Sequence, residues 1–190
     1  MKATQLTSTA TVDDYRGFKK RGDTMALAGL IYDRFFERFV EPFENNPAKH
    51  GFSVMAISCL MIEALHSFRK GWKRTGSKGG DAFEEFFASS SHLTDFTGHG
   101  TELYTNVRCG LLHQAETYGG WRIRRRGPML DPKGQAINAT KVMNCLKKEL
   151  RAYRCELEAE RSLRSPIWRK ALRKLDYIVK NTGANKTGRR

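Results

Sequence analysis

The segment from Phe52 to Trp72 most constrains the fold, because its residues 52–62 are apolar nearly all round. A helix with apolar side chains on every side is stable in water only when other elements cover it. We therefore predict a central helix over 52–72, with the rest of the chain packed around it. The 190 residues are enough for one domain whose core needs neither disulfides nor metal.

Apolar residues at steps of three and four predict an amphipathic helix over 24–44, with Asp23 as its N-cap. Similar patterns predict helices over 81–90, capped by Asp81, and over 97–116. A further helix is expected over 138–160, capped by Asn138, and a last one begins at Ser165-Pro166. The 138–160 helix carries a heptad-spaced apolar seam: Met143, Leu146, Leu150, Tyr153 and Leu157.

The remaining segments give the domain organisation. Residues 1–12 have no periodicity and are expected to form a disordered or loosely attached arm, and residues 181–190 a basic mobile tail. Residues 13–180 then form a single domain. Within it, residues 121–126 alternate large apolar and basic side chains before Gly127-Pro128. With residues 129–134 behind them, they predict a short basic hairpin or flap.

The charge is concentrated in the C-terminal part of the chain. Residues 1–116 hold 14 Lys and Arg against 14 Asp and Glu, so residues 117–190, with 20 against 6, carry the whole net charge of +14. Such a field attracts polyanions by neutralising phosphates and releasing counterions. Nucleic acid is the expected partner. No membrane contact is expected, because the basic segments lack an exposed apolar face, and the chain is expected to be cytoplasmic.

One short segment, residues 106–114, places an arginine and a histidine five positions apart: Arg108 and His113. A guanidinium keeps its charge at any physiological pH and can grip a phosphate, whereas an imidazole titrates near neutrality and can move a proton. Together the two side chains have the chemistry needed to cleave RNA without a metal or any other cofactor.

The run from Arg108 to His113, late in a helical chain and preceded by Tyr104, resembles the Arg-x4-6-His motif of the HEPN superfamily. The resemblance covers about a dozen residues as motif and residues 24–180 as architecture. It implies an all-α, HEPN-like up-and-down helical bundle with the basic flap following the motif helix. It further implies a metal-independent endoribonuclease, a toxin or anti-phage defence effector, with an antitoxin or other regulatory subunit as a possible partner.

The family chemistry assigns His113 as base or acid and Arg108 as the cation that stabilises the charged phosphorus. The 2'-OH of RNA attacks, so the products are a 2',3'-cyclic phosphate and a 5'-hydroxyl. Five α-helical positions separate the two side chains by about 140° around the helix axis. A homodimer with a composite site, in which both copies contribute these residues, resolves that difficulty. Gly110 would allow the two motif helices a close approach, or would pack within its own chain.

Other residues are assigned supporting roles. Glu63 interrupts the apolar central helix and therefore needs a cation, for which Arg108 is our choice and Arg69 the alternative. Asn106 and Gln114 flank the motif and could bind phosphate or orient His113. His66 could also face the site, or lie on a helix surface, and Tyr104 and Tyr118 could stack a base. The expected RNA-binding residues are those of the flap: Trp121, Arg122, Arg124, Arg125 and Arg126.

Three other functions remain open. The residue after the motif arginine is Cys109, where the family often has a polar residue, which allows a catalytically inactive module that binds RNA or nucleotides or acts as a scaffold. The heptad seam could pair with a second protein. The arginine-rich flap could read a DNA groove, although no helix-turn-helix pattern accompanies it.

Overall fold

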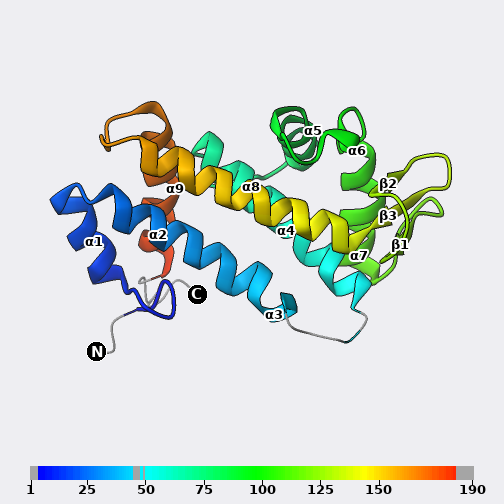
Figure 1. Cartoon of the computed structure of the whole chain (residues 1–190), viewed down its shortest axis with the longest axis horizontal. Coiled ribbons are helices and arrows are strands. Elements are labelled where there is room, and N and C mark those ends of the chain that lie inside the picture. The colour runs from blue at the N-terminus through cyan, green and yellow to red at the C-terminus, as the bar shows by residue number, and fades with distance from the viewer. Residues whose placement is uncertain (1–3, 45–47, 49, 183–190) are drawn as a thin grey trace, which may run out of the picture.

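The computed structural model describes residues 4–44, 48 and 50–182. The described chain is mostly helical, as predicted, and adds a small three-stranded sheet at one end (Figure 1). Two long helices cross its middle, α4 (Gly51–Lys70) and α8 (Ala139–Ala159). Both carry long runs of buried apolar residues, so the core lies between them.

The N-terminal arm expected over residues 1–12 is ordered where it is described. Leu6 is fully buried, its N–H donates to the carbonyl of Ala10, and its own carbonyl accepts from Arg34. The turn leads into α1 (Val12–Arg21), a helix that the sequence analysis missed. Thr11 and Asp14 form a capping box at its N-terminus. The prediction of a loose arm is therefore wrong for residues 4–11; residues 1–3 lie outside the described part.

The predicted helix over 24–44 is confirmed as a continuous run. It comprises α2 (Thr24–Phe35), a π-helical stretch, η1 (Phe36–Val40), and a last turn, α3 (Glu41–Glu44). The predicted cap is also confirmed, because the Asp23 side chain accepts from the N–H of Ala26.

The central helix α4 is confirmed and is packed against α5, α8 and α9. It is also long and apolar enough to span a membrane by length and composition, with a mean hydropathy of 1.5 over 18 residues. In this fold it is the core helix: Cys59, Met61, Ile62 and Leu65 are fully buried within the chain.

The segment after α4 forms a compact unit that carries the motif. It contains α5 (Gly79–Ser89), a 3-10 turn, η2 (Thr94–Phe96), then α6 (Gly100–Leu103), η3 (Tyr104–Cys109) and α7 (Gly110–Gln114). The helix predicted over 97–116 is thus present from residue 100, but its middle, η3, is π-helical. Asp81 is not a cap as predicted: α5 begins at Gly79, so Asp81 lies in its first turn.

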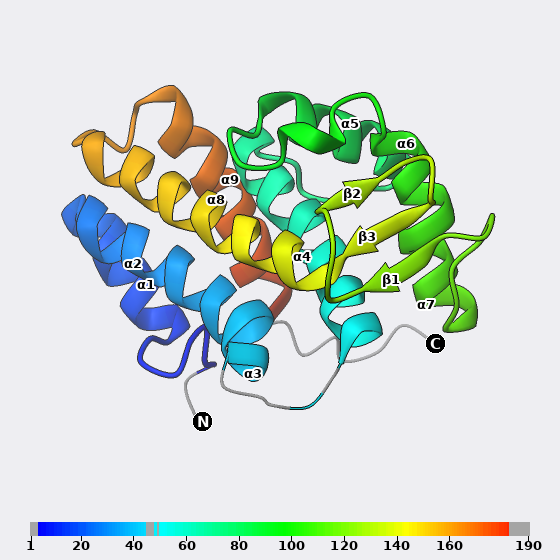
Figure 2. The same cartoon turned by 45° about the vertical axis from the view of Figure 1, so that its right-hand side comes forward.

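The predicted flap is a mixed sheet with the order β1-β3-β2. Its strands are β1 (Arg122–Arg124), β2 (Leu130–Asp131) and β3 (Ala136–Asn138). β2 and β3 are antiparallel, as in the expected hairpin, but β1 pairs with β3 in parallel. Figure 2 shows the sheet beside α6 and α7, with α8 starting directly after β3.

The two C-terminal helices begin where predicted. Asn138 caps α8 by accepting from the N–H of Lys141, and α9 (Pro166–Thr182) starts at the proline. All five residues of the heptad seam are buried, and α8 packs against α2 and α4 of the same chain. The seam is therefore not free to pair with a second protein. Of the tail predicted over 181–190, residues 181 and 182 end α9, and the rest lies outside the described residues.

Candidate functional site

The predicted pairing of Glu63 with Arg108 is confirmed. Arg108 Nε donates to Glu63 Oε1 at 2.6 Å, and the side chains are 18% and 14% exposed, respectively. One residue comes from the central helix α4 and the other from the π-helical stretch η3. The alternative partner of Glu63 is wrong, since Arg69 pairs with Glu149 and Glu156 instead.

The surroundings hold the Arg108 guanidinium charged and in place. Burial works against the charge, but the hydrogen bond and negative charge of Glu63 outweigh it and raise the pKa of Arg108. The guanidinium carbon also lies 5.2 Å from the centre of the Tyr104 ring, within the range of a cation–π contact. One of the five N–H donors of the arginine is committed to Glu63, and the remaining exposure lets others reach a phosphate.

Tyr104 is a packing residue here. Its ring contacts Phe83 edge-on, and a Cβ built on Gly79 would come within 2.2 Å of its hydroxyl oxygen, so only glycine leaves room for it. The ring is thus held between α5 and Arg108 and is not free to stack a base. Tyr118, by contrast, is 38% exposed.

His113 lies on the last turn of α7 and is exposed. Among the described residues, the imidazole of His113 has no hydrogen-bond or ion-pair partner. No hydrogen bond joins it to Arg108. The expected angular separation assumed regular α-helix, an assumption that fails because Arg108 lies in a π-helical stretch, whose hydrogen bonds run from i to i+5.

The backbone of Asn106 and the side chain of Gln114 bind the turn that follows the motif. The Asn106 carbonyl accepts from the N–H of Tyr118 at 2.7 Å, and Gln114 Nε2 donates weakly to the Glu116 carbonyl at 3.4 Å. A Cβ on Gly110 would lie 2.5 Å from that same Glu116 oxygen. Gly110 therefore packs within its own chain against residues 116–118, the second of its two predicted roles, and does not need a neighbouring motif helix.

The assignment of Trp121 to RNA binding is wrong. The side chain is only 3% exposed, because it forms part of the core next to the sheet, and it cannot stack a base. The signal was present, because the alternation of residues 121–124 places Trp121 on the apolar face of the strand, and a strand buries that face.

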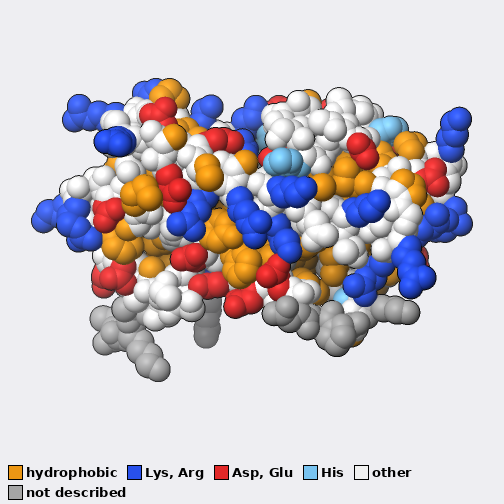
Figure 3. Space-filling view, in the orientation of Figure 1, with side chains coloured by type: hydrophobic (Ala, Val, Ile, Leu, Met, Phe, Trp, Pro, Cys, Tyr) orange, Lys and Arg blue, Asp and Glu red, His pale blue; other side chains and the backbone are white. Residues whose placement is uncertain are grey.

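The flap arginines divide into two pairs. Arg122 donates to the carbonyl of Gly134 at 2.6 Å, and Arg125 to the carbonyl of Ala48 at 3.1 Å, so both brace the backbone. Arg124 and Arg126 are exposed and have no side-chain partner within the described residues. Both line a shallow cavity of about 560 Å³ beside Phe52 at the start of α4. Lys and Arg side chains surround this right-hand end of the molecule (Figure 3).

His66 faces neither the motif nor solvent. Its ring is 1% exposed, packs edge-on against Trp72, and places Nε2 at 3.4 Å from Glu85 on α5. Burial, and after it the nearby Lys70, lowers the pKa of His66 to about 4. The histidine is therefore neutral at physiological pH and structural.

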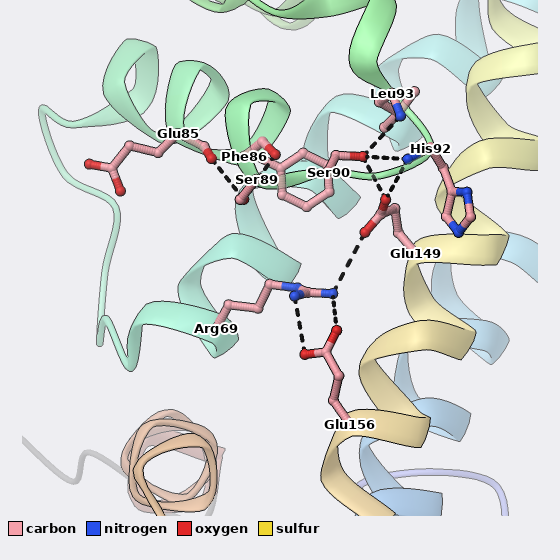
Figure 4. Close-up of polar contacts among 9 residues, drawn as sticks. All are labelled: Arg69, Glu85, Phe86, Ser89, Ser90, His92, Leu93, Glu149 and Glu156. Carbon is pink, nitrogen blue, oxygen red and sulfur yellow. Dashed lines mark hydrogen bonds and ion pairs between the residues drawn. The ribbon is translucent and has the colours of Figure 1, made fainter.

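The sequence analysis missed a buried polar cluster between α4, α5 and α8 (Figure 4). Glu149, only 3% exposed, accepts from Ser90 Oγ at 2.5 Å and from the N–H of His92, and lies 3.6 Å from Arg69. The signal was present, because Glu149 falls beside Leu150 on the apolar seam and needs partners as Glu63 does. The cluster ties the end of α5 to α8.

Within residues 4–44, 48 and 50–182, no group of three or more His, Cys, Asp or Glu side chains could hold a metal ion. Comparisons with models of protein families, with curated proteins and with solved structures found no match to this chain. The HEPN resemblance accordingly stays a prediction carried by the motif from Arg108 to His113.

Proposed function

We propose that the protein is a metal-independent endoribonuclease of HEPN type that acts as a homodimer. The observation that carries the proposal is the pair of Glu63 and Arg108, in which a partly buried carboxylate holds a charged arginine. Arg108 lies on the helix that ends with the exposed His113. The π-helical stretch that bears Arg108 supports it further, because such stretches occur frequently at functional sites.

The chemistry follows from the two side chains. The imidazole of one His113 takes the proton of a ribose 2'-OH, and the 2'-oxygen then bonds to phosphorus. The guanidinium of Arg108 stabilises the added negative charge on the phosphoryl oxygens. The bond from phosphorus to the 5'-oxygen breaks, and a protonated imidazole supplies the proton to that oxygen.

A second copy of the chain explains why Arg108 and His113 are not joined within one. An acid and a base are both needed, and one chain brings a single histidine to the motif helix. Leu112 lies beside His113 and is 39% exposed, so the motif helix presents an apolar side chain to a partner. We propose that two such helices meet there and bring two arginines and two histidines around one phosphate. A regulatory subunit that restrains such an activity is part of the same proposal.

The test incubates the full-length protein with mixed RNA in EDTA. Wild type should leave 2',3'-cyclic phosphate ends, and a substrate with 2'-deoxyribose at the cleaved position should resist. His113→Ala should lower the rate by about 10²-fold or more, and Arg108→Ala by a similar factor. Glu63→Gln, which removes the charge but keeps the shape, should have a smaller effect. Equal cutting by wild type and all three variants would reject the proposal.

A second candidate function is RNA binding without cleavage. It is favoured by the absence, within the described chain, of any contact between Arg108 and His113. RNA that binds to the wild-type protein and stays intact under every condition would support this candidate and reject the nuclease.

A further inference from the structure

A large basic cavity of the described chain shares no lining residue with the motif. It has a volume of about 700 Å³ and is formed by α1, by the segment after α4, and by α9. Six basic residues line it: Lys19, Lys73, Arg74, Arg169, Arg173 and Lys180. A smaller cavity of about 210 Å³ shares Lys73, Arg74 and Arg173 and adds Lys78. We call the two together the α9 cleft.

The acidic group in the α9 cleft is already neutralised. Asp176 is bound by Lys19 Nζ at 2.6 Å and accepts from the Tyr15 hydroxyl at 2.7 Å. Arg74 donates through Nε to the Tyr177 hydroxyl at 2.5 Å. The four other cations that line the 700 Å³ cavity have no side-chain partner among the described residues: Lys73, Arg169, Arg173 and Lys180.

The arrangement of these four cations calls for an external anion. Arg169 and Arg173 are four residues apart on one helix, where like charges repel each other. Lys73, from the segment after α4, lines the same cavity. Phosphate groups would neutralise the repulsion, and arginine can bind them through two parallel N–H groups. We propose that the α9 cleft binds the phosphate backbone of single-stranded RNA.

The size of the basic surface favours a chain of phosphates over a single one. From Arg169 to Lys180 the α9 helix rises by roughly 16 Å, which exceeds the reach of one phosphate group. The Tyr177 ring also lines the cavity, but the Arg74 guanidinium carbon lies 5.9 Å from its centre, so the cations supply the contacts to RNA. The choice of RNA as the polyanion rests on the proposed function.

The α9 cleft is separate from the flap. The central helix α4 ends at Lys70, and the next residue, Gly71, lines the cleft. Its first residue, Gly51, lines the cavity beside the flap. The 20 residues of the helix span about 30 Å. In Figure 1, α1 and α9 lie toward the left end and the sheet at the right. An RNA strand held in the cleft is thus anchored at a distance from the flap.

The experiment measures binding without cleavage. The full chain carries Arg108→Ala and His113→Ala as background, and anisotropy of a labelled single-stranded RNA gives the affinity at several salt concentrations. Three double variants are compared: Arg169→Ala with Arg173→Ala in the cleft, Arg124→Ala with Arg126→Ala in the flap, and Lys148→Ala with Arg151→Ala as control. The control pair is exposed on α8, outside the cleft, and removes the same charge.

The cleft variant should bind roughly tenfold or more weakly, and the slope of log K against log salt should fall by about 1.4, or 0.7 for each lost contact. The control should lose far less of both. Arg169→Lys with Arg173→Lys should keep the slope, because it keeps the charges. A cleft variant that matches the control in affinity and slope would overturn the proposal. If the wild-type protein binds RNA through the cleft but never cleaves it, the nuclease proposal is rejected and the proposed binding in the cleft is kept.

Discussion

At the residue scale, a partly buried carboxylate, Glu63, and a buried one, Glu149, show how one physical rule works in different places. Glu63 and Glu149 both lie on mostly apolar helix faces, and an ionised carboxylate there is costly without a partner. Each meets an arginine: Arg108 at 2.6 Å and Arg69 at 3.6 Å. The first pair leaves a guanidinium near the surface, where it can bind a ligand. The second has two further hydrogen bonds to residues 90 and 92 and joins helices.

The joining role of Glu149 predicts a large loss of stability when it is removed. Glu149→Ala should lower the free energy of unfolding by about 2–4 kcal/mol, because the Ser90 hydroxyl and the His92 N–H lose their buried acceptor and Arg69 keeps only Glu156. Glu156→Ala is the matched control: Glu156 binds the same arginine but is 44% exposed, and should cost no more than about 1 kcal/mol. Urea unfolding measures both. Similar losses for the two variants would show that the cluster is not stabilised through Glu149.

The buried His66 predicts a pH dependence of stability. Its pKa is about 4 in the folded chain, lowered first by burial, and about 6.5 when unfolded. Between these values the unfolded chain binds a proton that the folded chain does not. The stabilisation is therefore complete above about pH 6.5 and is lost as the pH falls toward 4, by at most roughly 3 kcal/mol.

The measurement for His66 compares unfolding free energies of wild type and His66→Phe from pH 7.5 to 4. The difference between the two proteins should change across that range, whatever its value at pH 7.5. The comparison removes the contribution of carboxylates, which titrate in both. A constant difference would assign the pH dependence to other groups.

At the scale of elements, the motif helix ends on a tight turn that only glycine allows. A Cβ at Gly110 would lie 2.5 Å from the Glu116 carbonyl oxygen and 3.0 Å from the Cα of Thr117. The turn reverses direction at Ala115, whose φ is +59°, and its backbone is held by Asn106 and Trp121. The position of His113 at the end of α7 thus depends on this packing.

Gly110→Ala should therefore destabilise the protein by about 1–3 kcal/mol, although alanine is the better helix former. Gly29→Ala in α2 is the control, because nothing lies within 4 Å of the added Cβ. It should stabilise the protein by up to about 1 kcal/mol. Thermal unfolding of both variants measures the difference. If Gly110→Ala stabilises the protein instead, residues 116–118 shift away from the added Cβ at little cost.

At the scale of the whole molecule, the fold places the basic flap beside the motif helices and the α9 cleft at a distance from them. Arg108 and His113 lie on the short helices of residues 100–114, the flap lies beside the start of α4, and the α9 cleft lies beyond its end. Under the proposed function, the flap and the α9 cleft hold RNA while the motif helices of two copies meet. The composite site is a property of the dimer, so it is tested with mixtures of chains.

A mixture of Arg108→Ala and His113→Ala chains should regain part of the cleavage that each variant loses, at a rate below wild type because only one imidazole is left to act as the base. After subunits exchange, mixed dimers hold one intact arginine and one intact histidine at the shared phosphate. The control mixes Arg108→Ala with the double variant Arg108→Ala and His113→Ala, which cannot assemble both groups. A rate of RNA cleavage in the first mixture that equals the control would place each site within a single chain.

Local patterns in the sequence determined the helices and several of their ends. The caps at Asp23 and Asn138 and the pairing of Glu63 with Arg108 were all predicted, because each depends on a spacing within one helix or on the cost of one buried charge. The coarse helical fold followed in the same way. The caps and the helices need no knowledge of which elements are neighbours, whereas the choice between Arg108 and Arg69 as the partner of Glu63 depended on the contact between α4 and η3.

Only the tertiary structure decided which elements cover each apolar face. The Trp121 side chain is buried in the core, and Leu6 is buried in the turn before α1. The apolar seam of α8 packs against α2 and α4 of the same chain. The parallel pairing of β1 with β3 and the cations gathered from three segments in the α9 cleft are also contacts between distant residues. A periodic pattern shows that a face must be buried, but its partner is set by how the whole chain packs.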